Sequence, residues 1–376
     1  MSARRKILSV VGTRPNFMKT APVVRELRRR YREFDHVLVH TGQHYDEEMS
    51  QIFIDELAIG DPDFFLGAGS GTHAQQIARV IERLEPVLVE TEPDVVLVSG
   101  DVNSTLAAAL AAATKRVRIG HIEAGLRSFD RTLPEEVNRV IVDALSSMLF
   151  IHSPEARSNL IVEGCDERAV HYVGNTMIDT LVALRERIEA VDAPAANGLR
   201  RGDYLLVTLH RHWLFEQEEL LMDTFSRLIE VADELEVVFP AHPRTQAALE
   251  ELGLAGKTRR LRLLPPLGYL EFLGLLAGAA GALTDSGGIQ EETTFLGVPC
   301  FTFRPNTERP ITVEMGTNMV LGLEPGRIGE VPGLIRQRQS LTSRTPPLWD
   351  GEAAKRIVDI LAVELDKAPS LAISGE

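Results

Sequence analysis

Ten residues in the second half of the sequence have the types and order of a phosphate-binding turn. Segment 283–292 reads Leu-Thr-Asp-Ser-Gly-Gly-Ile-Gln-Glu-Glu, a short apolar strand that passes through two glycines into a helix. Its Asp-Ser pair supplies good N-caps, and Gly287 and Gly288 let backbone approach a ligand closely. A helix N-terminus attracts phosphate through its unpaired amides and its dipole. Ser286 and these glycines are therefore candidates for binding a nucleotide phosphate, with Glu292 as an acceptor for ribose hydroxyls, although an ordinary capped connection fits the segment equally well.

Two histidine–arginine pairs follow expected strands in the same half of the chain. They are Thr-Leu-His210-Arg211 and Pro-Ala-His242-Pro-Arg244. Such cations at strand ends suit a diphosphate. Arg309, in the segment Thr-Glu-Arg-Pro after a later expected strand, adds another cation at that edge. A buried, hydrogen-bonded histidine is the ordinary structural alternative at either pair.

Carboxylates follow expected strands in the first half of the chain. Asp101, Glu123 and Glu135 stand at or just beyond strand ends, which in an open α/β sheet is the edge where ligands bind. Paired carboxylates suit acid–base chemistry. Each has a structural alternative: Asp101 as a helix cap, Glu135 as a first-turn acid, and Glu123 as a partner of Arg127.

Short β-branched segments alternate with longer helical patterns along the whole chain, which predicts α/β folding around parallel sheets. The expected strands are Ile7–Val11, His36–His40, Val95–Ser99, Val117–Ile122, Leu149–His152, His171–Val173, Tyr204–Thr208, Glu236–Phe239, Leu261–Leu264, Gly281–Leu283 and Cys300–Phe303.

The length of 376 residues predicts two domains. We expect an N-terminal lobe over residues 1–176 that carries the carboxylates, and a C-terminal lobe over residues 177–352 that carries the nucleotide turn. The boundary precedes a helix that leads into the linker-like segment 192–198. An amphipathic helix over residues 353–367 is expected to pack back on the first lobe.

Composition excludes several classes of function. The net charge of −14 argues against a broad nucleic-acid surface. Cys165 and Cys300 have neither disulfide-framework nor zinc-site spacing, so no metal is predicted. No apolar run is long enough for a signal peptide or a membrane helix. The sequence thus predicts a cytoplasmic protein that acts on a small molecule.

The first strand ends in Gly12-Thr-Arg-Pro-Asn-Phe-Met-Lys19, which has neither the dinucleotide fingerprint nor a Walker lysine. The glycine-rich segment 67–72 is more typical of a flexible connector. We therefore predict no cofactor.

Taken together, the motifs resemble those of the non-hydrolysing UDP-N-acetylglucosamine 2-epimerases, in order from Lys6 to about Gly322. They are Gly12-Thr-Arg-Pro, Thr41-Gly-Gln-His44, Gly100-Asp101, His121-Ile-Glu-Ala-Gly-Leu-Arg127, Pro134-Glu-Glu-Val-Asn-Arg139, His210-Arg211, Thr284-Asp-Ser-Gly-Gly-Ile-Gln-Glu-Glu292 and Thr307-Glu-Arg-Pro310. The resemblance implies a GT-B fold of two Rossmann-like lobes around a cleft. It also implies a homodimer that interconverts UDP-GlcNAc and UDP-ManNAc without an added cofactor, for cell-envelope polysaccharide synthesis.

The resemblance also implies roles for individual residues. Asp101, Glu123 and Glu135 become acid–base candidates, and His210 joins them as a catalytic candidate. The expected substrate-binding residues are Arg14, Lys19, Arg139, Arg211, His242, Ser286, Gly287, Gly288, Glu292 and Arg309. Because the C2 proton of the sugar is not adjacent to a carbonyl, elimination of UDP and its re-addition is the cofactor-free route. Which carboxylate takes the proton and which returns it stays open.

One segment departs from the family pattern. His212-Trp-Leu-Phe215 replaces the short polar run that family members commonly have after the His-Arg pair. An altered sugar pocket is therefore an open alternative, as are a hydrolysing epimerase and a GT-B glycosyltransferase. Residues 43–46 leave a second, substrate-activated site undecided.

Overall fold

The computed structural model describes residues 4–43, 56–241, 243–251, 253, 260–338 and 344–367. Within these ranges, the backbone alone is described for Arg14, His212, Pro243, Arg244, Ala248 and Arg338. The chain divides into two compact units. One consists of Met1–Val182 with Pro347–Glu376, and the other of Ala183–Pro346.

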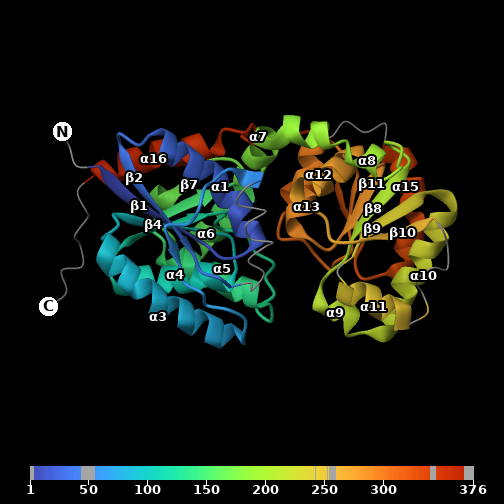
Figure 1. The fold of residues 1–376 in the computed structure, drawn as a ribbon, viewed down its shortest axis with the longest axis horizontal. Helices are drawn as coiled ribbons and strands as arrows, with labels where there is room; N and C mark the ends of the chain where they lie inside the picture. Colours follow the sequence, from blue (N-terminus) through green and yellow to red (C-terminus); the bar gives the residue numbers. More distant parts are fainter. Residues whose placement is uncertain are drawn as a thin grey trace. The chain divides into compact units, whose positions relative to one another are not determined.

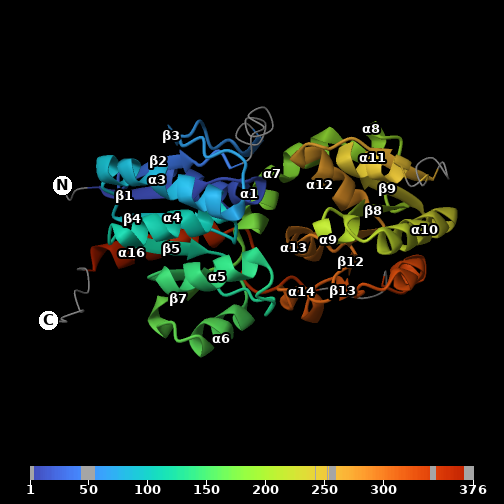
Figure 2. The same ribbon diagram turned by 90° about the horizontal axis from the view of Figure 1, so that it is seen from below.

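The first unit is built on a sheet of seven parallel strands in the order β3-β2-β1-β4-β5-β6-β7, with β3 and β7 at its edges (Figure 2). The strands are β1 (Arg5–Val11), β2 (Phe34–His40), β3 (Phe64–Phe65), β4 (Val95–Ser99), β5 (Arg118–Ile122), β6 (Met148–Ile151) and β7 (Val170–Tyr172). The strand order reverses direction between β1 and β4, which is the topological switch point of a Rossmann-like sheet.

Helices cover both faces of this sheet (Figure 1). They are α1 (Arg14–Arg29), α3 (His73–Thr91), α4 (Asn103–Thr114), α5 (Pro134–Leu145), α6 (Pro154–Val162), η1 (Glu167–Ala169) and α16 (Ala353–Asp366). Side chains alternate between the faces of a strand. Leu8 and Val96 accordingly pack with α3 and α4, whereas Ile7 and Val95 pack with α1 and α16.

The second unit repeats the arrangement with six parallel strands in the order β10-β9-β8-β11-β12-β13. These are β8 (Tyr204–Thr208), β9 (Glu236–Pro240), β10 (Leu261–Leu264), β11 (Gly281–Thr284), β12 (Cys300–Thr302) and β13 (Asn318–Val320). Its helices are α8 (Ala193–Ala196), α9 (His212–Phe215), α10 (Glu218–Glu234), α11 (Pro243–Glu251), α12 (Tyr269–Gly278), α13 (Gly287–Leu296), α14 (Ile311–Glu314), η2 (Pro325–Glu330) and α15 (Val331–Arg338). The switch point here lies between β8 and β11.

The chain crosses between the units twice. The first crossing occurs inside helix α7 (Thr176–Val191), and the second lies before Pro347. The linker-like segment 192–198 packs within the second unit, where Ala193 and Pro194 of α8 are buried against α12. Asp179 of α7 accepts hydrogen bonds from the amides of Ala353 and Ala354, at distances of 3.2 and 2.7 Å, and so caps α16.

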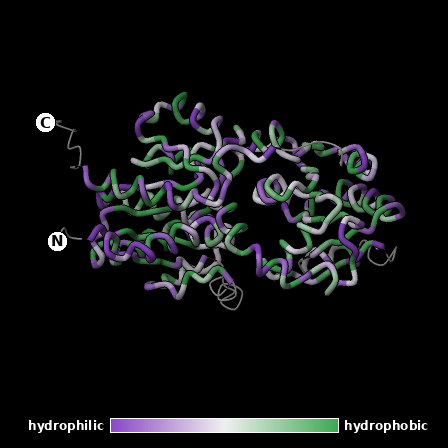
Figure 3. The backbone as a smooth tube through the Cα atoms, turned by 90° about the horizontal axis from the view of Figure 1, so that it is seen from above, coloured by the Kyte–Doolittle hydropathy of each residue, from purple (hydrophilic) through white to green (hydrophobic). Residues whose placement is uncertain are grey.

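All the expected strands are present, and their observed ends differ from the expected ones by at most two residues. Two short strands were not expected. Segment 61–65 reads as a loop but contributes the two-residue strand β3, and β13 was likewise not predicted. Hydrophobic and hydrophilic residues alternate along the helices around each sheet (Figure 3). Within the described ranges, none of the helices combines the length and apolar character needed to cross a bilayer.

Candidate active site

The carboxyl ends of β1, β4 and β5 place the candidate residues of the first unit close together, because parallel strands present these ends at one edge. Helix α1 starts directly after β1, and Asn16 in its first turn donates to the carbonyl oxygen of Ser99 at the end of β4, 2.7 Å away. Gly12 is required at this junction, since a Cβ there would lie 2.2 Å from the Ser104 hydroxyl. The first turn of α1 is thereby tied to the switch point.

Lys19 and Glu123 form a buried ion pair at this edge. Lys19 Nζ lies 2.7 Å from Glu123 Oε1, and the two residues are 5% and 6% exposed. Glu123 directly follows β5 with φ of 70°, a left-handed conformation that a glutamate adopts only when its surroundings enforce it. Gly100 makes room for the lysine, because a Cβ there would lie 3.0 Å from Nζ. Such strain at a buried charge is typical of a functional site.

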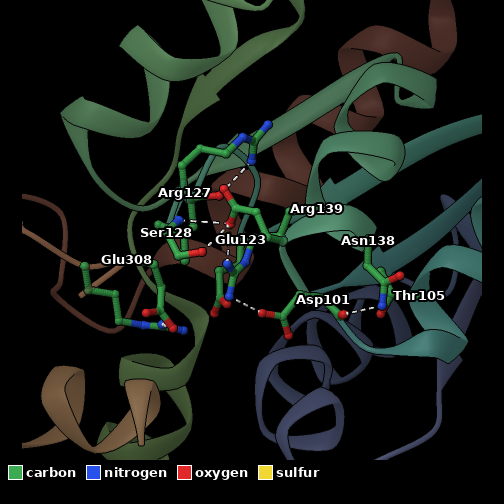
Figure 4. A network of polar contacts seen from close by, with 12 residues as sticks. Asp101, Thr105, Glu123, Arg127, Ser128, Asn138, Arg139 and Glu308 are labelled. Atoms are coloured by element: carbon green, nitrogen blue, oxygen red, sulfur yellow. Dashed lines mark hydrogen bonds and ion pairs between the residues drawn. The ribbon is translucent and has the colours of Figure 1, made fainter. Parts of the chain in front are cut away.

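Asp101 pairs with Arg139 of α5 rather than capping α4, whose N-cap is Val102. Arg139 lies 2.5 Å from Asp101 and 2.8 Å from Glu136, so it bridges the two carboxylates. Figure 4 shows Asp101, Glu123 and Arg139 in one group of polar side chains. The Asp101 side chain is 19% exposed and the Glu136 side chain 2%. Asp101 is thus the carboxylate of this pair that solvent or a ligand can reach.

Glu135 and Glu136 have different positions although they are adjacent in the first turn of α5. Glu136 is buried and accepts hydrogen bonds from the Ser128 amide, the Ser128 hydroxyl and the Phe129 amide, at 2.9, 3.0 and 2.9 Å. These contacts make it the structural acid that holds the loop after β5. Glu135 is half-buried, which leaves it as the acid–base candidate of the two.

A second network lies beneath this edge. His121 Nδ1 lies 2.6 Å from Asp143, and His121 Nε2 lies 2.8 Å from the carbonyl oxygen of Gly100. Arg127 pairs with Asp143 and Glu163 rather than with Glu123. Burial acts to raise the pKa of Asp143, but His121 and Arg127 outweigh it and hold that pKa below its ordinary value. No local pattern in the sequence points to Asp143, because it lies within helix α5.

The switch point of the second unit brings His210 next to Asp285. The ring atom Nδ1 lies 2.7 Å from Asp285 Oδ1. The other carboxylate oxygen accepts hydrogen bonds from the amides of His210 and Arg211, at 2.8 and 2.9 Å. Burial acts to raise the pKa of Asp285, yet these contacts hold it below its ordinary value. Asp285 therefore holds the loop after β8 instead of capping α13.

The start of α13 has the form expected of a phosphate-binding turn. Ser286 occupies the N-cap position and its side chain makes no capping hydrogen bond. Gly287 and Gly288 form the first turn, and Gly287 is required by a protein neighbour, because a Cβ there would lie 2.2 Å from the Arg309 guanidinium. The absence of Cβ at Gly287 thus serves internal packing as well as any ligand.

Arg309 and Glu292 are more deeply embedded than the sequence suggested. Arg309 is buried and pairs with Glu291 and Glu308, each at 2.7 Å. Glu292 is buried and accepts a hydrogen bond from the Tyr269 hydroxyl at 2.9 Å. Through these contacts, both residues support the turn at the start of α13.

The remaining expected binding residues are Arg211, His242 and Arg14. Arg211 is half-buried beside His210. His242 lies outside the described residues, and so does the side chain of Arg14.

The aromatic segment after His210 serves the core. In α9, Leu214 is fully buried, and Trp213 and Phe215 pack against the same hydrophobic cluster. The Trp213 ring lies 6.3 Å from that of Phe303. The bulk of these three side chains is thus accounted for by core packing, and it does not require a changed sugar pocket.

Comparison with known proteins identifies the family of this chain. The family model for UDP-N-acetylglucosamine 2-epimerase matches residues 25–362. A UDP-N-acetylglucosamine 2-epimerase of Methanococcus maripaludis is 40% identical over 365 residues, which span 95% of this chain and 98% of that protein. A UDP-2,3-diacetamido-2,3-dideoxy-D-glucuronate 2-epimerase of Pseudomonas aeruginosa is 38% identical over 368 residues, 95% of this chain and 99% of the relative.

Among solved structures, the UDP-GlcNAc 2-epimerase of Methanocaldococcus jannaschii in complex with UDP-GlcNAc and UDP matches with a TM-score of 0.87. It is 38% identical, and the match covers 95% of this chain and 99% of that one. The two parallel Rossmann-like sheets agree with the GT-B fold of these neighbours. The chain therefore belongs to the UDP-N-acetylglucosamine 2-epimerase family.

Proposed function

We propose that this protein is an isomerase that interconverts UDP-GlcNAc and UDP-ManNAc. In the forward direction, a carboxylate removes the C2 proton while the bond from C1 to the UDP oxygen breaks. A double bond forms between C1 and C2, giving 2-acetamidoglucal and UDP. UDP then adds back to C1 while a proton is delivered to the opposite face of C2. The proton removed from C2 is replaced by a different one, UDP returns to C1, and no electrons are gained or lost overall, so the route needs no cofactor.

The observation that carries the proposal is the set of charged pairs at the carboxyl edge of the first sheet. Lys19–Glu123 and Asp101–Arg139 hold carboxylates beside cations there, and carboxylates gathered at one sheet edge suit acid–base chemistry. Asp101, Glu123 and Glu135 are the proposed acid–base residues. Lys19 and Arg139 orient them, and Arg14 is proposed to act beside them.

The second unit is proposed to bind UDP. The turn formed by Ser286, Gly287 and Gly288 would accept the diphosphate, because helix N-terminal amides favour anions. Arg211 and His242 supply further donors, and His210 stabilises the charge that develops on departing UDP. Glu292 and Arg309 complete this half of the site.

Assembly and cellular setting belong to the proposal as well. We propose a homodimer that acts in the cytoplasm, in the synthesis of a cell-envelope polysaccharide. Family membership supports this setting.

A modified UDP-sugar is the second candidate substrate. The Pseudomonas aeruginosa relative, an epimerase of UDP-2,3-diacetamido-2,3-dideoxy-D-glucuronate, is nearly as similar to this chain as the UDP-GlcNAc epimerases are. An additional acetamido group at C3 and a carboxylate at C6 leave the chemistry at C1 and C2 unchanged. The elimination mechanism therefore holds for either sugar.

The deciding experiment is incubation with UDP-GlcNAc in deuterated water, followed by proton NMR, with the diacetamido glucuronate tested in parallel. Formation of UDP-ManNAc with deuterium at C2 is the expected result. Free ManNAc would instead show that water captures the intermediate, as in a hydrolysing epimerase. If neither sugar exchanges its C2 proton, the proposal fails, and transfer of the sugar to an acceptor becomes the function to test.

A further inference from the structure

We propose that Asp285 is a positioning residue for His210: the Asp285 carboxylate holds the imidazole ring in one orientation and one tautomer for the diphosphate of the substrate. The inference rests on the proposed function, because it assigns the His210 ring to departing UDP. It gives a role to Asp285, for which the sequence suggests only a helix cap. Both side chains belong to the second unit.

The two carboxylate oxygens of Asp285 make different contacts. Oδ2 accepts hydrogen bonds from the amides of His210 and Arg211 and thereby fixes the backbone of the loop after β8. Oδ1 lies 2.7 Å from Nδ1 of the His210 ring. At that distance two unprotonated acceptors would repel each other, so the proton of a neutral His210 must reside on Nδ1. The Nε2 atom then carries the lone pair, or a second proton when the ring is charged.

The exposed fractions of the two side chains show which of them a ligand can reach. The Asp285 side chain is fully buried, whereas 62% of the His210 side chain is exposed. A buried carboxylate that directs a solvent-facing imidazole is the arrangement by which acid–base histidines are held in one tautomer. The buried residue acts through the exposed one and does not itself need to reach a substrate.

The first test measures the ring of His210 in the free protein. In protein labelled with nitrogen-15 at the histidine rings, a His210→Gln variant assigns the signals of that ring. We expect a proton on Nδ1 at neutral pH. In Asp285→Asn the amide group would face Nδ1 with its N–H, so the ring proton should move to Nε2. An unchanged tautomer in Asp285→Asn would overturn the proposal.

The second test uses turnover. Asp285→Asn should lower kcat by about 100-fold with a much smaller change in KM, because a well-placed acid–base group contributes about 10²–10⁴-fold. In a His210→Gln background the same substitution should add less than about threefold, since the two residues act as one unit. Full additivity of the two losses would show a purely structural role and refute the proposal.

A matched variant controls for the loss of a buried polar group. Thr293→Val removes a buried hydroxyl that bonds only to carbonyl oxygens of its own helix α13, and kcat should stay within about twofold of wild type. The ring measurement needs no turnover, so it decides the role of Asp285 even if wild-type protein fails to convert UDP-GlcNAc.

Discussion

Lys19 and Glu123, which are 104 positions apart in the sequence, form a buried ion pair with 2.7 Å between Nζ and Oε1. The chain brings them together because α1 follows β1 and Glu123 follows β5 at the same edge of one parallel sheet. The backbone of Glu123 adopts a left-handed conformation at this position. Burial of two charges in this geometry is costly and indicates a functional role.

We predict that Glu123→Gln lowers kcat by at least about 100-fold, because the amide cannot accept the C2 proton. UDP should still bind with an affinity within about threefold of wild type, as measured by calorimetry, since the proposed UDP contacts belong to the second unit. The matched control is Glu85→Gln, which breaks an exposed pair with Lys115 and should leave turnover unchanged. Normal turnover in Glu123→Gln would remove this residue from the mechanism.

Asp101→Asn should abolish turnover in the same way and leave UDP affinity largely intact. Arg139 would retain Glu136 as a partner, at 2.8 Å, so the loop after β5 should keep its structure. Hydrogen–deuterium exchange at C2 of the substrate is the direct measurement. Loss of UDP affinity with normal exchange would reverse the assignment of roles to the two units.

The buried network around Asp143 should govern the stability of the first unit. Asp143→Ala would leave His121 without its carboxylate and Arg127 with Glu163 alone. Removal of one member of a buried ionic group costs about 3–5 kcal/mol, which urea unfolding can measure. The control, Asp166→Ala, breaks an exposed pair with Arg168 and should have a much smaller effect on stability, since water screens exposed ion pairs. Equal effects of the two substitutions would contradict the role given to the network.

Asp179 should make stability depend on pH. Burial raises the pKa of Asp179 from 3.8 to about 6. A raised carboxyl pKa favours the protonated form in the folded state, so its contribution is complete below about pH 4 and is lost as pH rises through 6. The loss amounts to about 3 kcal/mol, from about 1.4 kcal/mol per pKa unit.

Asp179→Asn should therefore lose less stability than wild type between pH 4.5 and pH 7.5, in urea unfolding followed by circular dichroism. Because Ala353 and Ala354 donate to different oxygens of Asp179, the single amide oxygen of Asn can accept only one of these hydrogen bonds. That loss lowers stability at every pH and leaves the comparison of pH dependence intact. Asp359→Asn, at an exposed position that pairs with Arg30, serves as the control and should follow wild type. Parallel pH curves for wild type and Asp179→Asn would refute this prediction.

Much of the fold follows from local patterns in the sequence. Alternating β-branched strands and helices predict two parallel sheets, because each strand and helix shows its own hydrophobic period. The family motifs also place Asp101, Glu123 and the 283–292 turn at strand ends. The two residues of β3 are too few for a period to be seen, and β13 was also not predicted.

Tertiary structure alone decided which charged residues meet. Sequence spacing suggested that Glu123 pairs with Arg127 and that Asp285 caps a helix, but the partners are Lys19 and His210. Local spacing describes contacts within one element, whereas these pairs join segments that follow different strands, 104 and 75 positions apart. The sequence by itself determined the elements, the motifs and the class of chemistry. The partners of the charged groups were decided by the strand order of each sheet, because the order determines which strand ends become neighbours.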